Sequence, residues 1–442
     1  MRTPICDFLE DYAKRGNVRM HMPGHKGHGD SIHALDLTEV TGADSLFLAD
    51  GIIKESEMCA SEIFGALTYY STEGSSLCIR AMVRLISLYA ASLGKSPLIL
   101  AARNAHRSFV SAISLTGCNV EWLCGEGESY LSCKITPKMI EKRLCEAEPP
   151  TAVYVTSPDY LGCTCDIEGI AKICHKHGVL LAVDNAHGAY LKFLSESRHP
   201  MDLAADICCD SAHKTLPAMT GTAYLHINHE APKLFFEYAK DAMALFASTS
   251  PSYILLASLD RLNSELSTDF KTKMQIFVDK ITLLKWDLAN LGFELYGDEP
   301  AKITILTKSY GYLGEAMAEA LEGAGIVCEF SDSDHLVLMP SPSNTDDELE
   351  RLSEALGSLP RLAPIDKKPP TFSAPTPVMT PAKALSLPYE YVPCEESVGR
   401  ILAEITVGCP PAVPIAVSGE LITRDIADAF VYYGAKKVAV VK

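Results

Sequence analysis

The sequence predicts an α/β fold with a large domain on a mostly parallel sheet, a smaller α+β domain and a small C-terminal domain. Across residues 61–247, short apolar runs alternate with helical patterns, which is typical of a parallel sheet covered by helices. The 442 residues are too many for one ordinary core. A proline-rich stretch at 360–381 predicts a stiff, extended linker before the last domain, at 382–442.

The first domain elements follow in chain order. A short helical pattern opens residues 1–60, and the Gly- and His-rich stretch 20–29 predicts a loop that covers a site, with solvated histidines as the alternative. The large domain comes next, because apolar runs of strand length alternate with helical periodicity. The expected strands are 66–71, 97–102, 120–123, 151–156, 179–184 and 221–227, and the expected helices are 77–93, 107–115 and 167–176.

The second half of the chain has a different pattern. We expect a long helical stretch over 247–289, at the start of the smaller α+β domain of residues 248–359. Short strands then alternate with helices, and a further helix is expected in the C-terminal domain. The strands are expected at 303–307, 327–330 and 336–339, and the C-terminal helix at 425–432.

Composition and charge narrow the classes of function. The net charge of −17 (39 basic minus 56 acidic residues) disfavours nucleic acid and anionic membranes as partners and is compatible with a cationic substrate. No apolar window reaches the roughly 18 residues of a membrane span, and no apolar leader opens the chain, so we expect a cytoplasmic protein. The 15 cysteines have no repeating spacing, which predicts free thiols. Cys163 and Cys165 have no second pair at zinc-site spacing, so we expect no metal.

The stretch 210–215, Asp-Ser-Ala-His-Lys-Thr, is the strongest functional candidate. Lys214 follows an apolar run, and an amine in a partly dry pocket loses solvation that keeps it protonated. Its free base can then attack a carbonyl and form a Schiff base. Ser211 and His213 are hydrogen-bonding groups close to that amine, suited to an anion such as a phosphate. From this stretch alone, a lysine with its ammonium in water remains the alternative.

Further candidates stand where predicted strands end. Ser75 and Ser76 open a helix after a strand, where amide N–H groups and hydroxyls can bind an anion; a plain helix cap is the alternative. His106 follows a strand end, where open α/β sheets place ligand-contacting residues, and it is either stacked on a planar group or an ordinary surface histidine. Asp184 ends a buried strand, so its carboxylate needs a partner, which we expect to be cationic.

Together these residues meet the needs of one cofactor, pyridoxal phosphate. It requires a lysine for an imine, an acid against its pyridinium nitrogen, hydroxyls and amides for its phosphate, and a flat group against its ring. Lys214 supplies the amine for the imine, Asp184 supplies the acid, and His106 supplies the flat group. The serines at 75, 76 and 211 supply the hydroxyls. Four such features in one chain favour a Schiff base on Lys214 over a solvated lysine.

Several stretches resemble the ornithine/lysine/arginine decarboxylase family of fold-type-I pyridoxal-phosphate enzymes, particularly its short bacterial members. They are 21–26 (His-Met-Pro-Gly-His-Lys), 103–108 (Arg-Asn-Ala-His-Arg-Ser), 183–188 (Val-Asp-Asn-Ala-His-Gly), 211–215 (Ser-Ala-His-Lys-Thr), 249–253 (Thr-Ser-Pro-Ser-Tyr) with 257–260, and 399–404. The Ser-x-His-Lys element is the most specific of them. The resemblance implies a large domain of the fold-type-I transferase type and decarboxylation of lysine, arginine or ornithine to the corresponding amine and CO2.

The resemblance also implies roles for single residues. Lys214 would carry the cofactor as an imine, His106 would stack on its ring, and Asp184 would pair with the ring nitrogen. The remaining cofactor contacts would come from Ser75, Ser76, Ser211, His213 and His187. Lys214 or His213 would return a proton to the substrate Cα. The family's active site lies at a dimer interface, so the resemblance implies a homodimer in which Thr249 reaches the partner's phosphate.

The sequence departs from the family pattern at three positions. Asp159 stands where members often carry Thr or Asn, Gly221 where larger members tend to have Gln, and Ala412 where a glycine is usual. Two alternatives to the decarboxylase remain open. One is an aminotransferase or other lyase, because the same fold and the same lysine serve other reactions. The other is a non-catalytic, cofactor-binding relative, which the departures at Asp159 and Gly221 suggest.

Overall fold

The computed structural model describes residues 1–125, 133–371, 375–409 and 413–442, so the position of Ala412 lies outside the described residues. The chain divides into two compact units, each built from separate segments of sequence. Unit 1 comprises Met1–Leu98, Ile140–Tyr154 and Ile167–Lys273, and unit 2 comprises Ile99–Met139, Val155–Asp166 and Met274–Lys442. All of the residues that we expect to hold the cofactor, except His106, belong to unit 1.

Unit 1 is organised on a sheet in which β1, β7, β6, β5 and the first part of β4 are successive neighbours. The strands are β1 (Leu67–Ser71), β4 (Ala152–Thr156), β5 (Leu180–Asp184), β6 (Ile207–Asp210) and β7 (Ala223–Ile227). β5 and β6 pair in parallel with Asp184 opposite Cys209, whereas β7 is antiparallel to both β6 and β1. Every residue of β5, β6 and β7 is buried, as expected for strands covered on both faces.

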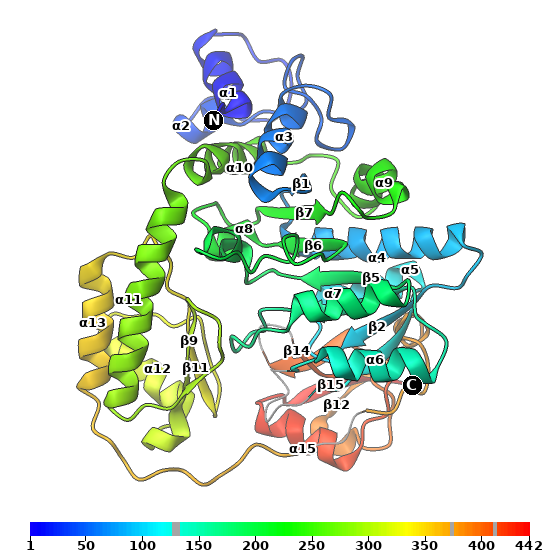
Figure 1. Cartoon of the computed structure of the whole chain (residues 1–442), viewed down its shortest axis with the longest axis vertical. Coiled ribbons are helices and arrows are strands. Elements are labelled where there is room, and N and C mark those ends of the chain that lie inside the picture. Colours follow the sequence, from blue (N-terminus) through cyan, green and yellow to red (C-terminus); the bar gives the residue numbers. More distant parts are fainter. Residues whose placement is uncertain (126–132, 372–374, 410–412) are drawn as a thin grey trace. The chain divides into compact units, whose positions relative to one another are not determined.

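Helices cover this sheet. The long helix α4 (Gly74–Ser92) packs on β6 and β7, α9 (Lys233–Ala244) packs on α4, and α7 (Ile167–Lys176) packs on β5. Near the N-terminus, α1 (Pro4–Lys14), α3 (Ile52–Phe64) and α10 (Tyr253–Leu266) lie against one another (Figure 1). The remaining short elements are α2 (Ser31–Leu35), α6 (Pro137–Glu146), the single turn α8 (Ala212–Thr215) and 3-10 turns at Leu46–Leu48 and Ala189–Phe193.

Unit 2 contains an antiparallel sheet with strand order β10-β11-β9-β8. Its strands are β8 (Leu295–Tyr296), β9 (Ile303–Leu306), β10 (Phe330–Ser331) and β11 (His335–Leu338). The helices of this part are α11 (Phe270–Asn290), α12 (Gly314–Gly323), which packs on β11, and α13 (Asp346–Gly357). Unit 2 also includes β3 (Asn119–Leu123), most of β2 (Leu98–Ala102), and the helix between them, α5 (Arg107–Thr116).

The C-terminal part of unit 2 has two strand pairs and its own apolar core. β12 (Tyr389–Pro393) pairs with β15 (Lys437–Val441), and β13 (Thr406–Cys409) pairs with β14 (Val413–Val417). The short helix α14 (Pro381–Leu385) precedes them, and α15 (Arg424–Tyr432) contributes Ile426 and Phe430 to a core that also holds Ile415 and Val438. Buried side chains on both strand pairs and on α15 therefore share one apolar cluster.

The predicted fold class, a mixed α/β fold with a large and mostly parallel sheet, is confirmed. The predicted strands and helices of the large domain appear with shifts of a few residues at their ends. The long helical stretch over 247–289 is wrong: residues 245–252 are not helical, and α10 and α11 are separate helices. Pro251 lacks the N–H that a continuous helix would need there. The strand predicted at 327–330 is also wrong, because only Phe330 belongs to β10.

Two expectations from composition can be compared with the structure. Among the described side chains, no cysteine forms a disulfide. Burial raises the pKa of Cys208 and Cys209 well above the usual value, so both are neutral thiols inside the sheet. Within the described residues, no helix combines the length and the apolar character that crossing a membrane requires.

Candidate active site

Asp184 is the last residue of β5 and is almost completely buried, with 2% of its surface exposed. Its carboxylate accepts hydrogen bonds from the Tyr154 hydroxyl at 3.2 Å and from the Ala186 N–H at 3.2 Å, and the Cys209 thiol lies at 3.6 Å. These contacts are all with neutral groups. The cationic side-chain partner that we expected is not among the contacts of Asp184 in the described part of the chain. A buried carboxylate in such surroundings has capacity left for a positive charge.

Lys214 lies in the single turn α8, which follows β6 directly. Its Nζ lies 2.9 Å from Nε2 of His187, a buried histidine three residues after Asp184. Because an ammonium group can only donate, His187 accepts at Nε2 whenever Lys214 is charged. The lysine amine therefore contacts the short loop that Asp184 begins.

Three groups suited to an anion surround the start of α4. The Ser211 hydroxyl donates to the Ser75 hydroxyl at 2.8 Å, and Ser76 follows in the same first turn. The N-cap residue, Glu73, makes no side-chain hydrogen bond to the first-turn N–H groups. α4 has 19 residues, so its dipole and these N–H groups favour a negative charge at this end. Ser75 and Ser211 come from segments far apart in sequence, and the fold brings their hydroxyls together.

His213 is oriented by the backbone. Its Nδ1 donates to the Thr222 carbonyl oxygen at 2.9 Å, because a carbonyl can only accept. In the neutral ring, Nε2 then carries the lone pair and can accept a proton. Contact with a phosphate through Nε2 would instead require a ring protonated at both nitrogens.

His106 and Thr249 have contacts of a different kind. His106 belongs to unit 2, where it is the N-cap of α5: its Nδ1 accepts from the Ser108 N–H at 3.1 Å. A capping role for this side chain is therefore visible within unit 2. Thr249 is exposed, and the N–H of its neighbour Ser248 donates to Glu73 at 2.7 Å, next to the start of α4.

The comparisons with known proteins agree with this geometry. The family model for the major domain of Orn/Lys/Arg decarboxylases matches residues 3–292, more than half of the chain. The chain belongs to the Orn/Lys/Arg decarboxylase family. An arginine decarboxylase from Halalkalibacterium halodurans is 29% identical over 96% of this chain and 92% of its own length. The uncharacterized protein YaaO of Bacillus subtilis is 31% identical over 96% of this chain and 93% of its own.

Solved structures share the fold of this decarboxylase. The Francisella novicida lysine decarboxylase LdcF has a TM-score of 0.81 at 18% identity, over 100% of this chain and 81% of that one. The protein SPT with PLP has a TM-score of 0.54 at 15% identity, over 72% of this chain and 79% of that one. The chain is therefore a pyridoxal-phosphate-dependent amino-acid decarboxylase of fold type I.

The residues of unit 1 fit this cofactor. Asp184 offers a buried carboxylate with neutral contacts, which suits a protonated ring nitrogen. The start of α4 with the Ser75 and Ser211 hydroxyls suits a phosphate. Lys214 offers a primary amine next to the loop that follows Asp184. The described side chains thus offer a negative charge for the ring nitrogen, hydrogen-bond donors for the phosphate and an amine for the imine.

Two departures of this decarboxylase from the family pattern have local structural roles. Asp159 is buried, and its carboxylate accepts from the Cys163 N–H at 2.8 Å, so it holds its own turn in unit 2. Gly221 has a φ of +96°, a conformation that residues with a Cβ rarely adopt. Its carbonyl accepts from the Gly74 N–H at 2.7 Å, directly before Ser75. Gly221 therefore helps to fix the start of α4.

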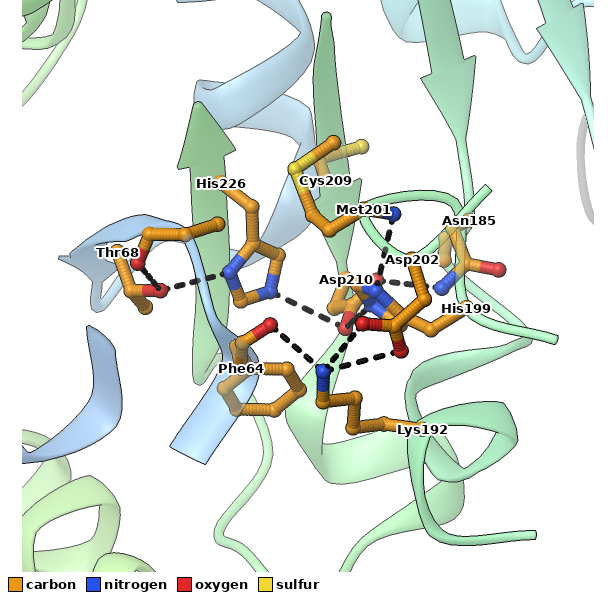
Figure 2. Close-up of polar contacts among 12 residues, drawn as sticks. Phe64, Thr68, Asn185, Lys192, His199, Met201, Asp202, Cys209, Asp210 and His226 are labelled. Atoms are coloured by element: carbon orange, nitrogen blue, oxygen red, sulfur yellow. Dashed lines mark hydrogen bonds and ion pairs between the residues drawn. The ribbon is translucent and has the colours of Figure 1, made fainter. Parts of the chain in front are cut away.

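Sequence patterns missed a second group of buried polar residues in the decarboxylase. Tyr154 contacts Asp184 from β4, and Asn185 donates from its side chain to Asp210 at 2.7 Å. Asp210 ends β6 and also contacts two buried histidines, His199 and His226 (Figure 2). A signal for Asp210 was present, because it ends an apolar run just as Asp184 does. No sequence pattern pointed to the two histidines.

Proposed function

We propose that this protein decarboxylates a basic amino acid, with arginine as the first candidate, to the corresponding amine and CO2. The observation that carries the proposal is the buried Asp184 carboxylate, whose contacts are neutral and whose loop reaches the Lys214 amine through His187. An acid placed in this way can keep a ring nitrogen protonated, which a decarboxylase needs for withdrawing electrons from the substrate Cα.

Each residue of the site has a task under this proposal. Pyridoxal phosphate, when bound, supplies the electron sink for the bond to the leaving carboxylate. Lys214 would hold the cofactor through its amine, and Asp184 would keep the proton on the ring nitrogen. The start of α4 with Ser75, Ser76 and Ser211 binds the phosphate. His187 orients the Lys214 amine, and Lys214 or His213 returns a proton to Cα from a protonated nitrogen.

The substrate proposal rests on two observations. Two relatives that match 96% of this chain at 28% to 29% identity, from Halalkalibacterium halodurans and Bacillus subtilis, are named arginine decarboxylases, whereas an inducible lysine decarboxylase of Escherichia coli matches the same share at 22% identity. The lysine decarboxylase LdcA of Pseudomonas aeruginosa matches 58% of this chain and 39% of its own length. The net charge of −17 favours the approach of a cationic amino acid over an anionic one. Arginine is therefore the substrate to test first, followed by lysine and ornithine.

Other parts of the proposal concern assembly and location. We propose a cytoplasmic homodimer with a shared active site, in which Thr249 contacts the partner's phosphate. Several large apolar side chains of unit 1 are exposed and would be covered by a second copy: Val18, Met20, Met22, Ile32, Leu48 and Met58. His106 stacks on the cofactor ring in this proposal. The domain division at residues 60, 247, 359 and 381 also remains a prediction.

The first prediction tests the role of Lys214. Lys214→Ala should abolish turnover and remove the visible absorbance that arises when the lysine amine is joined to pyridoxal phosphate, because no other primary amine replaces it. Lys233→Ala is the matched control: this lysine is 86% exposed in an ion pair with Glu237, and its removal should leave spectrum and rate unchanged. An unaltered spectrum in Lys214→Ala would overturn the assignment.

A substrate panel separates the proposed reaction from its alternatives. Purified protein reconstituted with pyridoxal phosphate is given arginine, lysine and ornithine, and the amine product is detected by mass together with the released CO2. Formation of agmatine from arginine is the expected result. Keto-acid formation without CO2 would indicate an aminotransferase, and cofactor binding without turnover of any amino acid would indicate a non-catalytic relative.

A further inference from the structure

Asp210 is the last residue of β6, and its carboxylate is completely buried between three donors. One oxygen, Oδ2, accepts from Nε2 of His199 at 3.0 Å and from Nε2 of His226 at 3.2 Å. The other oxygen, Oδ1, accepts from the Asn185 side-chain amide at 2.7 Å. Figure 2 shows these side chains converging on the carboxylate. Among the described residues, both oxygens of this fully buried group thus accept at least one hydrogen bond.

The partners of the two histidines determine where their protons lie. The Met201 N–H donates to Nδ1 of His199 at 3.3 Å, so Nδ1 of this ring is an acceptor and its proton is on Nε2. On the second ring, Nδ1 of His226 lies 2.9 Å from the Thr68 hydroxyl, which also donates to the Ala66 carbonyl oxygen at 3.3 Å. Nε2 of this ring donates to Asp210, because an ionised carboxylate can only accept. Both rings therefore present an N–H to Asp210.

This arrangement keeps Asp210 ionised. Burial alone would raise the pKa of its carboxyl, but His199 and His226 outweigh burial and hold the pKa below the usual value. A protonated carboxyl would place its own O–H against N–H donors, which cannot accept it. The negative charge at the end of β6 is thus stabilised by the two histidines, which attract it electrostatically and donate hydrogen bonds to it.

Asp210 connects the two loops that carry the site. Asn185 follows Asp184 directly, and its own N–H donates to the Cys209 carbonyl at 3.0 Å. Its side-chain amide donates to Asp210, while its Oδ1 is buried and has no hydrogen-bond partner in the described chain. The orientation of this amide is therefore set by Asp210, because turning it over would place an oxygen against the carboxylate. On the other side, Asp210 immediately precedes Ser211 and the turn with Lys214.

We propose that Asp210 is a positioning residue for the decarboxylase reaction: it acts through Asn185 to fix the loop of Asp184 and His187 relative to Ser211 and Lys214. The inference rests on the proposed function, since it assigns a task relative to the residues that hold the cofactor. Asp210 has no task in the chemistry itself. Its removal would let the loop after β5 shift against α8, and displacements of about 1 Å are known to cost on the order of 100-fold in rate.

The test compares Asp210→Ala with Asp206→Ala, a matched control at the other end of the same strand. Asp206 is also buried and also pairs with a histidine: its carboxylate accepts from the Leu181 N–H at 2.7 Å and from His175 at 3.1 Å. Both variants should melt at lower temperature, because each leaves buried donors unpaired. Only Asp210→Ala should weaken binding of pyridoxal phosphate to the cofactor-free protein, by on the order of tenfold, and lower kcat.

Asn185→Ala is the second variant and decides the outcome if Asp210→Ala does not fold. It removes the hydrogen bond from Asn185 to Asp210, while the contacts of Asp210 with His199 and His226 stay in place. We expect it to reproduce the losses in cofactor affinity and kcat with a smaller change in melting temperature. In the double variant the two losses should not add, because Asp210 acts through Asn185. If the losses in cofactor affinity and kcat were additive, Asp210 would not act through Asn185.

The results also separate this inference from the proposed function. Wild-type protein that binds no pyridoxal phosphate would overturn both. Wild-type protein that binds it normally, with Asp210→Ala and Asn185→Ala equal to wild type in cofactor affinity and kcat, would overturn only the positioning role. A melting temperature lowered in Asp210→Ala as in Asp206→Ala, with kcat unchanged, would show that Asp210 is structural alone.

Discussion

The ends of β5 and β6 make an informative comparison, because two neighbouring parallel strands each end in a buried aspartate with different surroundings. Asp210 receives three hydrogen bonds of 2.7 to 3.2 Å from N–H groups. Asp184 receives two of 3.2 Å and has a thiol at 3.6 Å. A thiol is a weak donor, so the carboxylate of Asp184 is less well satisfied than that of Asp210.

The difference teaches how to distinguish a functional from a supporting carboxylate. Burying an ionised carboxylate costs free energy, and hydrogen bonds from the protein offset that cost. At Asp210 three N–H donors of the protein itself provide this offset. At Asp184 the offset is incomplete, which is what a site for a positively charged ring nitrogen requires. Burial and residue type are the same in both places, so only the contacts separate the two roles.

The largest effect that would sharpen this comparison is expected from Asp184→Asn. The Tyr154 hydroxyl can accept as well as donate, so the new amide fits, and the free energy of unfolding of the cofactor-free protein should change little. An amide cannot hold a proton on the ring nitrogen, so kcat should fall by on the order of 10²- to 10⁴-fold. Steady-state kinetics and urea unfolding of the same preparation measure the two quantities.

Asp210→Ala is the matched comparison for stability. It should lower the free energy of unfolding by about 3 kcal/mol, because it leaves buried donors without their charged acceptor. Asp184→Asn should therefore have the larger effect on kcat, and Asp210→Ala should have the larger effect on the free energy of unfolding. If Asp184→Asn destabilised the protein as much as Asp210→Ala does, the two carboxylates would be equivalent and the distinction drawn from their contacts would be lost.

Sequence patterns identify one of these aspartates more easily than the other. Asp184 could be assigned because a carboxylate at the end of an apolar run, followed 30 residues later by Lys214, fits one cofactor. Asp210 stands at the end of a similar run, but its meaning depends on His199 and His226, which reach it through tertiary packing and have no fixed spacing. The failure at 247–252 has the same origin: periodicity continued there, and the local effect of Pro251 prevailed.

A second, smaller effect concerns the acid side of the pH dependence. Burial lowers the pKa of His226 in the folded protein, against the opposing effect of Asp210, so the unfolded chain takes up this proton first as the pH falls below about 6.5. Stability from the neutral ring is present above that pH and is lost as the pH falls towards the lowered pKa. His226→Gln keeps an N–H for Asp210 and does not titrate. Its urea-unfolding free energy should therefore fall less than that of wild type between pH 6.5 and 5.

Protonation of the Asp210 carboxyl should reduce the stability at a lower pH than protonation of His226 does. Its pKa is lowered in the folded state, so its contribution is present above the unfolded value of about 3.9 and is lost as the pH falls below it. The two contributions therefore occupy different pH windows. An identical loss of stability in wild type and His226→Gln between pH 6.5 and 5 would mean that this ring takes up its proton over the same pH range in the folded and the unfolded chain.

The smallest effect is expected from Tyr154→Phe, which removes one of the two 3.2 Å hydrogen bonds to Asp184. Burial, with Asp184 adding to it, raises the pKa of Tyr154 well above its usual value, so the hydroxyl is protonated and can only weakly compete with a cation for the carboxylate. Its loss should cost about 1 kcal/mol of stability and change kcat by less than about threefold. A loss of rate as large as that of Asp184→Asn would place the hydroxyl itself in the reaction, and the carboxylate would then be its support.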